Sequence, residues 1–279
     1  MIGKVLKVNA GFYDILSSDE KVYRTRGSGN LRETSQNPLV GDQVKFNPDG
    51  FLFEILPRKN FLIRPKVANI DQVVIVTALT QPKFSSFLLD KFLAIIEFQE
   101  IEPIILFTKS DLIDDKIYCE YKSQGYKVLK ISNEDKNQDF TELVNLLKGK
   151  LSVFTGQSGA GKSSTINNIS NLDIKTQIIS KSLGRGKHTT RTVEIYRLDE
   201  FELIDTPGFS ILESNLSEND LAKSFHDFRK LSFKCEFRTC IHFREINCKI
   251  KDEVEKGNIM KSRYDNYLRL ISEVKENER

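Results

Sequence analysis

The 279-residue sequence lacks any apolar run that approaches the roughly 20 consecutive apolar residues a membrane-spanning helix needs. It also lacks a secretory signal at its start. There, MIGKVLKVNAGFYDIL alternates polar and apolar residues and has neither an apolar block nor a small-residue cleavage site. No internal repeat or low-complexity tract is visible. These absences predict a cytoplasmic chain with no membrane partner, made of two domains or three small ones.

The sequence also has little net charge, +3 from 42 Lys/Arg and 39 Asp/Glu, so nucleic-acid binding cannot be inferred from the total. The distribution is more informative. Residues 1–66 carry 11 Lys/Arg against 7 Asp/Glu, a net of +4, whereas residues 67–211 carry 17 against 19, a net of −2. A basic front end fits a phosphate-backbone partner such as RNA, and a solvated basic face explains it equally well.

The front of the chain has the pattern of a small all-β domain. Short alternating runs (KVLKV, FYDIL, KVYRT, QVKF and FLFEIL) are separated by turn-forming stretches such as SSDE and NPDG. Five short strands in this length predict a closed barrel, with an OB-fold as the leading candidate. We therefore predict an RNA-binding OB-fold domain over residues 1–65, and LPRKNFLIRPKVANID, which has two prolines, is predicted to be a linker.

The middle of the chain, residues 66–212, alternates strand and helix patterns. VVIVTAL is a continuous apolar run, typical of a strand buried on both faces. SSFLLDKFLAIIEFQ has helical spacing, and the strand-like runs PIILF, KVLKI and LSVFT follow with helical stretches between them. This alternation predicts a parallel sheet with right-handed crossovers.

The stretch GQSGAGKS, from Gly156 to Ser163, matches the phosphate-binding pattern G-x-x-x-x-G-K-[ST]. It follows the apolar run LSVFT and opens a predicted helix, which is the context that the pattern requires. Lys162 is expected to reach the β- and γ-phosphates, and Ser163 to ligate Mg²⁺. The predicted nucleotide contacts of this loop are Gly156, Gln157, Ser158, Gly159, Ala160, Gly161, Lys162, Ser163 and Ser164.

Two further segments complete a predicted phosphate and magnesium site. LIDTPGF places Asp205 where a carboxylate near Mg²⁺ belongs, and Gly208 where a backbone N–H can meet a γ-phosphate. The intervening SLGRGKHTTRT supplies Thr190, with Thr189 as the alternative, as the threonine that closes on Mg²⁺.

The stretch TKSD (Thr108, Lys109 and Asp111) fits the guanine-recognition pattern [NT]-K-x-D. Asp111 can accept hydrogen bonds from guanine N1–H and the 2-amino group, which adenine cannot donate. Ser132 and Asn133, after the next strand, are predicted to add backbone contacts to the base. This pattern precedes the phosphate-binding loop, whereas GTPases usually have the reverse order. We therefore predict a circularly permuted GTPase domain that binds GTP or GDP with Mg²⁺.

A group that orients the attacking water is less evident. Many GTPases have glutamine just after the D-x-x-G glycine, but this chain has Phe209 there, and no built-in arginine finger is identifiable. His188 is the candidate water-orienting residue, and a loop histidine without a role is an equally open reading. Slow hydrolysis that a partner accelerates is therefore expected.

The last predicted domain, residues 213–279, contains CEFRTCIHFREINC. Three thiols and one imidazole complete a tetrahedral structural zinc site, and reduced buried cysteines or redox pairs are the alternatives. A capping box is predicted at Ser217–Asp220, and one long helix from Asp252 to Val274. The predicted ligands of one zinc ion per chain are Cys235, Cys240, His242 and Cys248.

With these motifs assembled, the chain resembles the ribosome small-subunit-dependent GTPase A family (RsgA). The similarity includes VGDQV, LPRKNFLIRP, ANIDQVVIV, TKSDL, GQSGAGKSS, GRGKHTTR, DTPGF, CEFRTCIHFREINC and RYDNYLRL, nearly end to end. Where the family usually has Glu-Pro-Gly before the last cysteine, this chain has Glu245, Ile246 and Asn247, and the ligands are intact.

The resemblance implies a multidomain α/β chain with an N-terminal OB-fold, a permuted P-loop GTPase domain and a C-terminal helical zinc-binding domain. It further implies a monomer that binds the small ribosomal subunit and its rRNA, acts in late maturation of that subunit, and hydrolyses GTP faster when bound to it. The alternative is an RNA-binding scaffold whose nucleotide site senses GTP or GDP without turnover as its main role.

Overall fold

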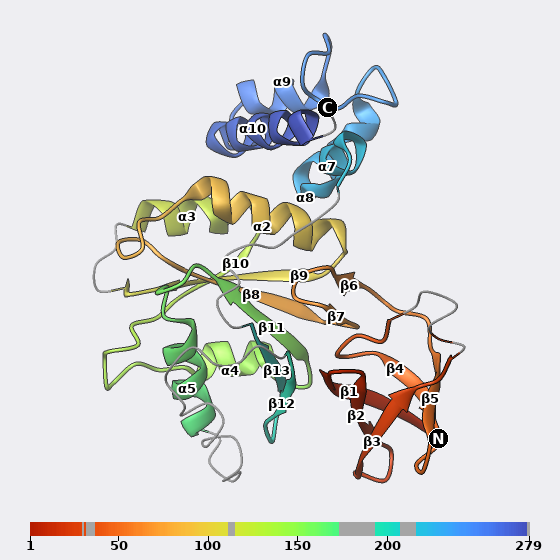
Figure 1. Cartoon of the computed structure of the whole chain (residues 1–279). Coiled ribbons are helices and arrows are strands. Elements are labelled where there is room, and N and C mark those ends of the chain that lie inside the picture. The colour runs from red at the N-terminus through yellow and green to blue at the C-terminus, as the bar shows by residue number, and fades with distance from the viewer. Residues whose placement is uncertain (30, 32–36, 111–114, 173–192, 207–215, 278–279) are drawn as a thin grey trace.

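The computed structural model has three regions in chain order: a β-barrel, a layered α/β region and a helical region (Figure 1). The structure describes residues 1–29, 31, 37–110, 115–172, 193–206 and 216–277. Among these residues, no helix has the length and apolar character needed to cross a membrane.

The barrel confirms the predicted all-β front domain. Its strands close in the order β1-β2-β3-β5-β4, with β3 parallel to β5 and the other pairs antiparallel. Because successive side chains alternate faces, one face of each strand fills the barrel, and Val5, Ile15, Val44 and Phe46 are fully buried there. The strands are β1 (Ile2–Asn9), β2 (Phe12–Ser17), β3 (Val22–Gly27), β4 (Gln43–Phe46) and β5 (Phe51–Ile55).

The segment predicted to be a linker is instead a packed hairpin of β6 (Phe61–Leu62) and β7 (Val67–Ala68). Leu62 and Val67 belong to the hydrophobic core of the α/β region. Asn60 fixes the base of the hairpin, since its amide donates to the Ile70 carbonyl (2.8 Å) and accepts from the Ile70 N–H (2.9 Å). The prolines and basic residues of the segment favoured the prediction of a linker, although its apolar residues Leu62 and Val67 are buried in the core.

A six-stranded sheet forms the centre of the α/β region, in the order β10-β9-β8-β11-β13-β12. All neighbours are parallel except β12, which runs antiparallel to β13 at the edge. Every residue of β8 and β11 is buried, which confirms the prediction of strands covered on both faces. The strands are β8 (Gln72–Ala78), β9 (Glu102–Thr108), β10 (Lys127–Lys130), β11 (Leu151–Gly156), β12 (Ile195–Arg197) and β13 (Glu202–Asp205).

Helices cover both faces of this sheet (Figure 1). One face carries α2 (Ser86–Phe98) and α3 (Asp115–Ser123), and the other carries α4 (Thr141–Leu147) and α5 (Lys162–Leu172). Val73 of β8 packs in the core with α2, whereas the next residue, Val74, belongs to the core beneath α4 and α5. Adjacent residues of one strand therefore build two separate cores.

The helical region packs on α2 (Figure 1). Ser217 caps its first helix in the predicted capping box with Asp220. The predicted single helix from Asp252 to Val274 is wrong: the chain forms two helices, because Gly257 adopts a left-handed φ of +77° that ends the first one. The elements are α7 (Glu218–Ser224), α8 (His226–Leu231), the 3₁₀ helix η2 (Ser232–Lys234), α9 (Lys249–Glu255) and α10 (Lys261–Asn277).

The barrel is attached to the edge of the sheet through β1. Lys7 forms a β-bridge with Glu194, and its ammonium pairs with the Glu194 carboxylate. Lys4, on the same strand, pairs with Glu202 of β13 at 2.5 Å. Basic residues of the barrel thus neutralise acidic residues of the sheet edge.

Candidate nucleotide site and metal cluster

Four parallel strands end at one edge of the sheet and bring the predicted nucleotide motifs together. β8 and β9 end at paired residues Ala78 and Thr108. β11 ends at Gly156, and its Phe154 pairs with Asp205 at the end of β13. In open parallel sheets, ligands bind at the carboxyl ends of the strands. Segments about 100 residues apart in the chain therefore line the same edge.

The backbone of the phosphate-binding loop requires glycine at two positions. Gly156 has φ +148°, and a Cβ there would lie 2.0 Å from the Val76 carbonyl oxygen on β8. Gly161 has φ +91°, and a Cβ there would lie 2.9 Å from Asn133 Nδ2. The loop is thus packed against β8 on one side and against the loop after β10 on the other. Ser163 and Ser164, just beyond it, are exposed at the start of α5.

Lys162 and Asp205 form an ion pair at this edge. Lys162 is the first residue of α5 and is only 9% exposed, and Asp205 is the last residue of β13. A phosphate group that binds the Lys162 ammonium has to replace the Asp205 carboxylate as its partner. Likewise, a cation that binds the Asp205 carboxylate has to replace the Lys162 ammonium.

The base-side residues lie beside the phosphate-binding loop. Thr108 is fully buried, and its hydroxyl donates to the Ala160 carbonyl at 2.5 Å. Lys109 has a left-handed φ of +58°, and its ammonium donates to the Gln81 carbonyl. The Ser132 N–H donates to Gln138 Oε1 at 2.7 Å. The structure therefore places Thr108 against the loop that is expected to hold the phosphates, and Lys109 against the loop between β8 and α2.

Several predicted site residues lie outside the residues that the structure describes. They are Asp111 of the guanine motif, the switch threonine Thr190, Gly208 of D-x-x-G, and His188. Their assigned roles stay predictions from the sequence.

One contributor to this edge has no motif and was not predicted: the loop between β8 and α2. Gln81 binds the Lys109 ammonium through its carbonyl. A Cβ at Gly159 would meet Pro82 Cδ at 3.9 Å. The stretch LTQPKFSS has the composition of an ordinary turn, so nothing in it signalled a place beside the nucleotide motifs.

The four predicted zinc ligands converge on one point. Their ligand atoms all lie within 4.8 Å of one another. Nδ1 of His242 lies 3.3 Å from the sulfur of Cys240, 3.4 Å from that of Cys248 and 3.6 Å from that of Cys235. Ligands about 2.0–2.3 Å from one zinc ion stand about 3.5 Å apart in a tetrahedron. The donor set and its spacing are therefore compatible with one zinc ion.

The loop that carries the cluster is held by a hydrogen bond from α10 and by two hydrogen bonds within the loop. The Tyr264 hydroxyl donates to the His242 carbonyl at 2.8 Å. The carboxylate of Glu245 accepts the N–H groups of Ile241 (2.6 Å) and Phe243 (2.8 Å). These hydrogen bonds orient the backbone that presents His242, which has φ +58°.

Burial governs the ionisation of the cluster. It raises the pKa of the Cys240 thiol to about 12 and lowers the pKa of His242 to about 4. The imidazole is therefore neutral at physiological pH, as a metal ligand must be. The thiols need a cation among them to ionise, which a bound divalent metal ion supplies.

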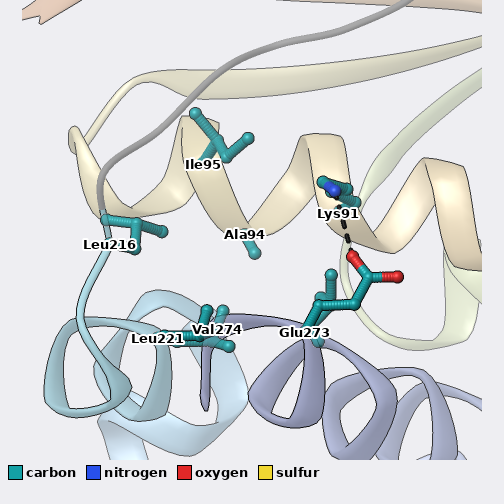
Figure 2. Close-up of a pocket in the computed structure, with 8 residues that line it drawn as sticks. Lys91, Ala94, Ile95, Leu216, Leu221, Glu273 and Val274 are labelled. Carbon is teal, nitrogen blue, oxygen red and sulfur yellow. Dashed lines mark hydrogen bonds and ion pairs between the residues drawn. The ribbon is translucent and has the colours of Figure 1, made fainter. Parts of the chain in front are cut away.

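A small cavity lies between the helical region and α2, and an ion pair stands at its rim (Figure 2). The cavity has a volume of about 100 Å³. Lys91 of α2 pairs with Glu273 of α10 at 3.2 Å, and Ala94 of α2 faces Leu221 and Val274 across the cavity. The contact therefore joins α2 to both the first and the last helix of the C-terminal region.

Buried charges lie further along the same interface. Arg263 of α10 is fully buried, with its guanidinium 3.5 Å from Glu97 of α2 and 4.8 Å from the ring centroid of Tyr126. Asp90 of α2 is also fully buried and accepts a hydrogen bond from Asn266 of α10 at 2.6 Å. Breaking this interface would leave ionisable groups of α2 without their partners, so α2 and the C-terminal helices are expected to move together.

The Asp90 carboxyl makes this interface sensitive to pH. Burial raises its pKa to about 6, although Arg263 and the hydrogen bonds from Asn266 and Tyr121 oppose the rise. The folded protein then holds the Asp90 proton more tightly than the unfolded chain does. The Asp90 contribution to stability is consequently present below the ordinary pKa of 3.8 and lost as pH rises to about 6.

We expect Asp90→Asn to remove the loss of stability that the ionisation of Asp90 causes as pH rises. The free energy of unfolding of the variant, relative to that of the wild type, should rise by roughly 2–3 kcal/mol between pH 4 and pH 7, because only the wild type must ionise a buried carboxyl. Urea unfolding of both proteins across this range measures the difference. The exposed Asp265→Asn is the control, and a pH-independent difference for Asp90→Asn would contradict the expectation.

The permuted order of the motifs, the phosphate-binding loop and the C-terminal Cys₃His cluster together define the class of protein: a circularly permuted GTPase. The chain is similar to the crystal structure of "YloQ, a circularly permuted GTPase", with a TM-score of 0.79 and 38% identity over 99% of this chain and 95% of that one. It is similar to YjeQ from Thermotoga maritima with a TM-score of 0.79 and 30% identity over 98% of both chains. These similarities confirm the predicted fold class.

Sequence comparison then identifies the family. The model of the RsgA GTPase domain matches residues 55–215, and that of the RsgA N-terminal domain matches residues 2–50. A Mycoplasmopsis pulmonis protein named "Small ribosomal subunit biogenesis GTPase RsgA" is 50% identical over 277 residues, which cover 99% of this chain and all of that protein. The chain belongs to the RsgA GTPase family, as its motifs indicated, and is a GTP hydrolase.

Proposed function

We propose that this GTPase binds the small ribosomal subunit, acts in its late maturation, and hydrolyses GTP to GDP and phosphate faster when bound to the subunit. The main support is the near end-to-end similarity to relatives named as small ribosomal subunit biogenesis GTPases. The clustering of a phosphate-binding loop, Thr108 and Asp205 at one sheet edge supports the same proposal. We further propose that the protein works in the cytoplasm as a monomer.

The roles we propose for the site combine the described contacts of Lys162 and Asp205 with the sequence motifs. Lys162 leaves Asp205 to bind the β- and γ-phosphates, and Ser163 with Thr190 ligates Mg²⁺. Asp111 reads the guanine base, and the Gly208 N–H meets the γ-phosphate. Magnesium neutralises charge on the phosphate oxygens when it is bound.

Two further roles complete the proposal. His188 orients the attacking water when the protein is bound to the subunit. One zinc ion, held by the Cys₃His cluster, stabilises the C-terminal domain. The proposed domains are residues 1–65, 66–212 and 213–279.

The surface of the barrel supports an RNA partner. Phe51 and Phe53 of β5 are 53% and 41% exposed, which is unusual for phenylalanine. Arg26 stacks over the Phe12 ring at 4.6 Å. Exposed aromatic rings next to basic side chains form platforms for unpaired bases and a backbone of phosphates. We therefore propose that the barrel contacts rRNA.

Turnover of GTP with and without isolated small ribosomal subunits tests this function. We expect slow hydrolysis by the protein alone and an increase of roughly 10³-fold or more with subunits, the scale of catalytic groups supplied by a partner. Large ribosomal subunits serve as the control. Binding to small subunits without stimulated turnover would instead favour an RNA-binding scaffold that senses GTP and GDP.

The Lys162–Asp205 ion pair leads to a specific prediction for Asp205→Asn. Magnesium-dependent turnover should fall by roughly 100-fold, because a carboxylate near the cation is lost. Binding of GDP without magnesium should be unchanged or up to about 5-fold tighter, because Lys162 no longer has to leave a carboxylate. Titration with and without magnesium measures both effects.

The exposed Asp265→Asn is the matched control for this charge removal. Weaker magnesium-free binding of GDP by Asp205→Asn would show that Lys162 does not exchange Asp205 for phosphate.

A further inference from the structure

Two consecutive carbonyl groups of the phosphate-binding loop accept hydrogen bonds from the base-side half of the sheet. The Thr108 hydroxyl, at the end of β9, donates to the Ala160 carbonyl at 2.5 Å. The Asn133 side-chain amide, in the loop after β10, lies 3.2 Å from the Gly161 carbonyl. The donors and acceptors are 28 to 52 residues apart in the chain. Asn133 and Thr108 thus connect the two halves that the permutation places in reverse order.

Asn133 is itself held by residues of α5. Its Nδ2 lies 3.1 Å from the hydroxyl of Thr165, which is fully buried. The Asn168 amide donates to the Asn133 backbone carbonyl and to its Oδ1, each at 3.3 Å. The side chain is therefore fixed in one orientation, with its donor directed at the Gly161 carbonyl.

The direction of these carbonyls determines the direction of the N–H groups beside them. In a trans peptide the C=O and the following N–H point in opposite directions. A donor on the Ala160 carbonyl orients the Gly161 N–H. The Gly161 carbonyl, which orients the Lys162 N–H, accepts from the Asn133 amide at 3.2 Å and from the N–H (2.9 Å) and hydroxyl (3.0 Å) of Thr165, so Asn133 acts there together with Thr165. Backbone N–H groups in this type of loop are the ones that surround phosphate oxygens.

We propose that Asn133 is a positioning residue for phosphate binding: it holds the Gly161–Lys162 peptide with its N–H toward the nucleotide. The inference rests on the proposed GTPase function. The sequence predicts a backbone contact of Asn133 to the base, whereas this inference gives its side chain a role on the phosphate-binding loop. Gly161 allows this contact, since a Cβ there would lie 2.9 Å from Asn133 Nδ2.

Affinities for GDP and IDP distinguish this role from one in which the Asn133 side chain reads the base. IDP lacks the 2-amino group of guanine and has the same phosphates. We expect Asn133→Ala to weaken binding of both nucleotides by about 10-fold, the scale of one lost hydrogen bond, and to leave the GDP-to-IDP ratio unchanged. The exposed Asn137→Ala, in the same loop, is the matched control and should bind like the wild type.

Turnover gives a second readout. Because the orientation of the loop serves substrate and transition state alike, KM for GTP should rise about 10-fold while kcat changes less than about 2-fold. Asn133→Asp keeps the shape of the side chain but turns its donor into a carboxylate facing the Gly161 carbonyl. Its loss of GDP affinity should therefore be at least as large as that of Asn133→Ala.

Three results would overturn the inference. They are unchanged GDP affinity in Asn133→Ala, a loss confined to GDP that lowers the GDP-to-IDP ratio, and wild-type affinity in Asn133→Asp. A wild-type protein that binds neither nucleotide would instead overturn the proposed function, and the inference with it.

Discussion

Replacing Cys240 with alanine is expected to release zinc from the protein and to unfold the loop that carries the cluster. Structural zinc sites contribute about 10–16 kcal/mol of apparent binding free energy at neutral pH, so one of four ligands accounts for roughly 2.5–4 kcal/mol. Zinc affinity should therefore fall by roughly 60- to 700-fold. Elemental analysis of the purified variant measures the zinc, with about one equivalent expected in the wild type.

The consequences should extend beyond the loop. Phe228 packs edge-on against the His242 ring at 5.7 Å, and the Tyr264 hydroxyl is bonded to the His242 carbonyl. Loss of the metal therefore removes support from the core between α8 and α10. We expect the thermal unfolding of the C-terminal region to shift to lower temperature, with the nucleotide site of the variant still able to bind GDP.

Cys119 provides the matched control, because it is an exposed cysteine on α3, away from the cluster. Cys119→Ala should keep its zinc. A wild-type protein that folds its C-terminal region without zinc, or a Cys240→Ala variant that retains a full equivalent, would contradict the zinc assignment.

Replacing Ser163 with alanine is expected to lower magnesium-dependent GTP turnover by at least about 100-fold, because the cation loses a protein ligand that fixes it beside the phosphates. Ser163 is exposed at the start of α5, so the stability of the fold should change little. GDP binding in the absence of magnesium should be close to that of the wild type. Steady-state turnover across a magnesium titration separates these effects.

The matched control for Ser163 is Ser123→Ala, an exposed serine at the end of α3. Its turnover should be that of the wild type. If Ser163→Ala kept the wild-type magnesium dependence, Ser163 would not be a magnesium ligand.

Local physical requirements explain why the sequence predicted so much of this fold. VVIVTAL has no polar face, so it indicated a strand covered on both sides, and β8 is such a strand. A Cβ at Gly156 or Gly161 would collide with a neighbouring segment of the same chain. The glycines of the phosphate-binding pattern therefore reflect a requirement of the backbone geometry. The cysteines and His242 are the only donors of their kind in a short polar segment, and they converge as expected.

The features that were missed depend on partners distant in the chain. The Asn133 side chain acquires its place only when β10 lies beside α5. The hairpin of β6 and β7 packs against a core that forms from residues downstream of it. The buried group of Asp90, Glu97 and Arg263 joins positions up to 173 residues apart, and each of them resembles a surface charge on a helix. No pattern within a short window carries this information.

The permuted order has a mechanical consequence. The chain runs from Asp205, at the phosphate edge, to Ser217, at the cap of α7, within 12 residues. The C-terminal region nevertheless packs on α2, which belongs to the base-side half. We propose that a change near Gly208 is passed to these helices, which Glu97 and Arg263 anchor to α2; equal positions of the C-terminal region in structures with GDP and with a GTP analogue would contradict this.

Sedimentation of the protein with isolated small ribosomal subunits tests the central proposal most directly. The subunits are mixed with protein that carries a non-hydrolysable GTP analogue or GDP, and the protein that pellets with them is measured. The account predicts retention with the GTP analogue and binding at least about 10-fold weaker with GDP, a coupling within the usual range for linked sites. No binding in either state, or equal binding in both, would contradict it.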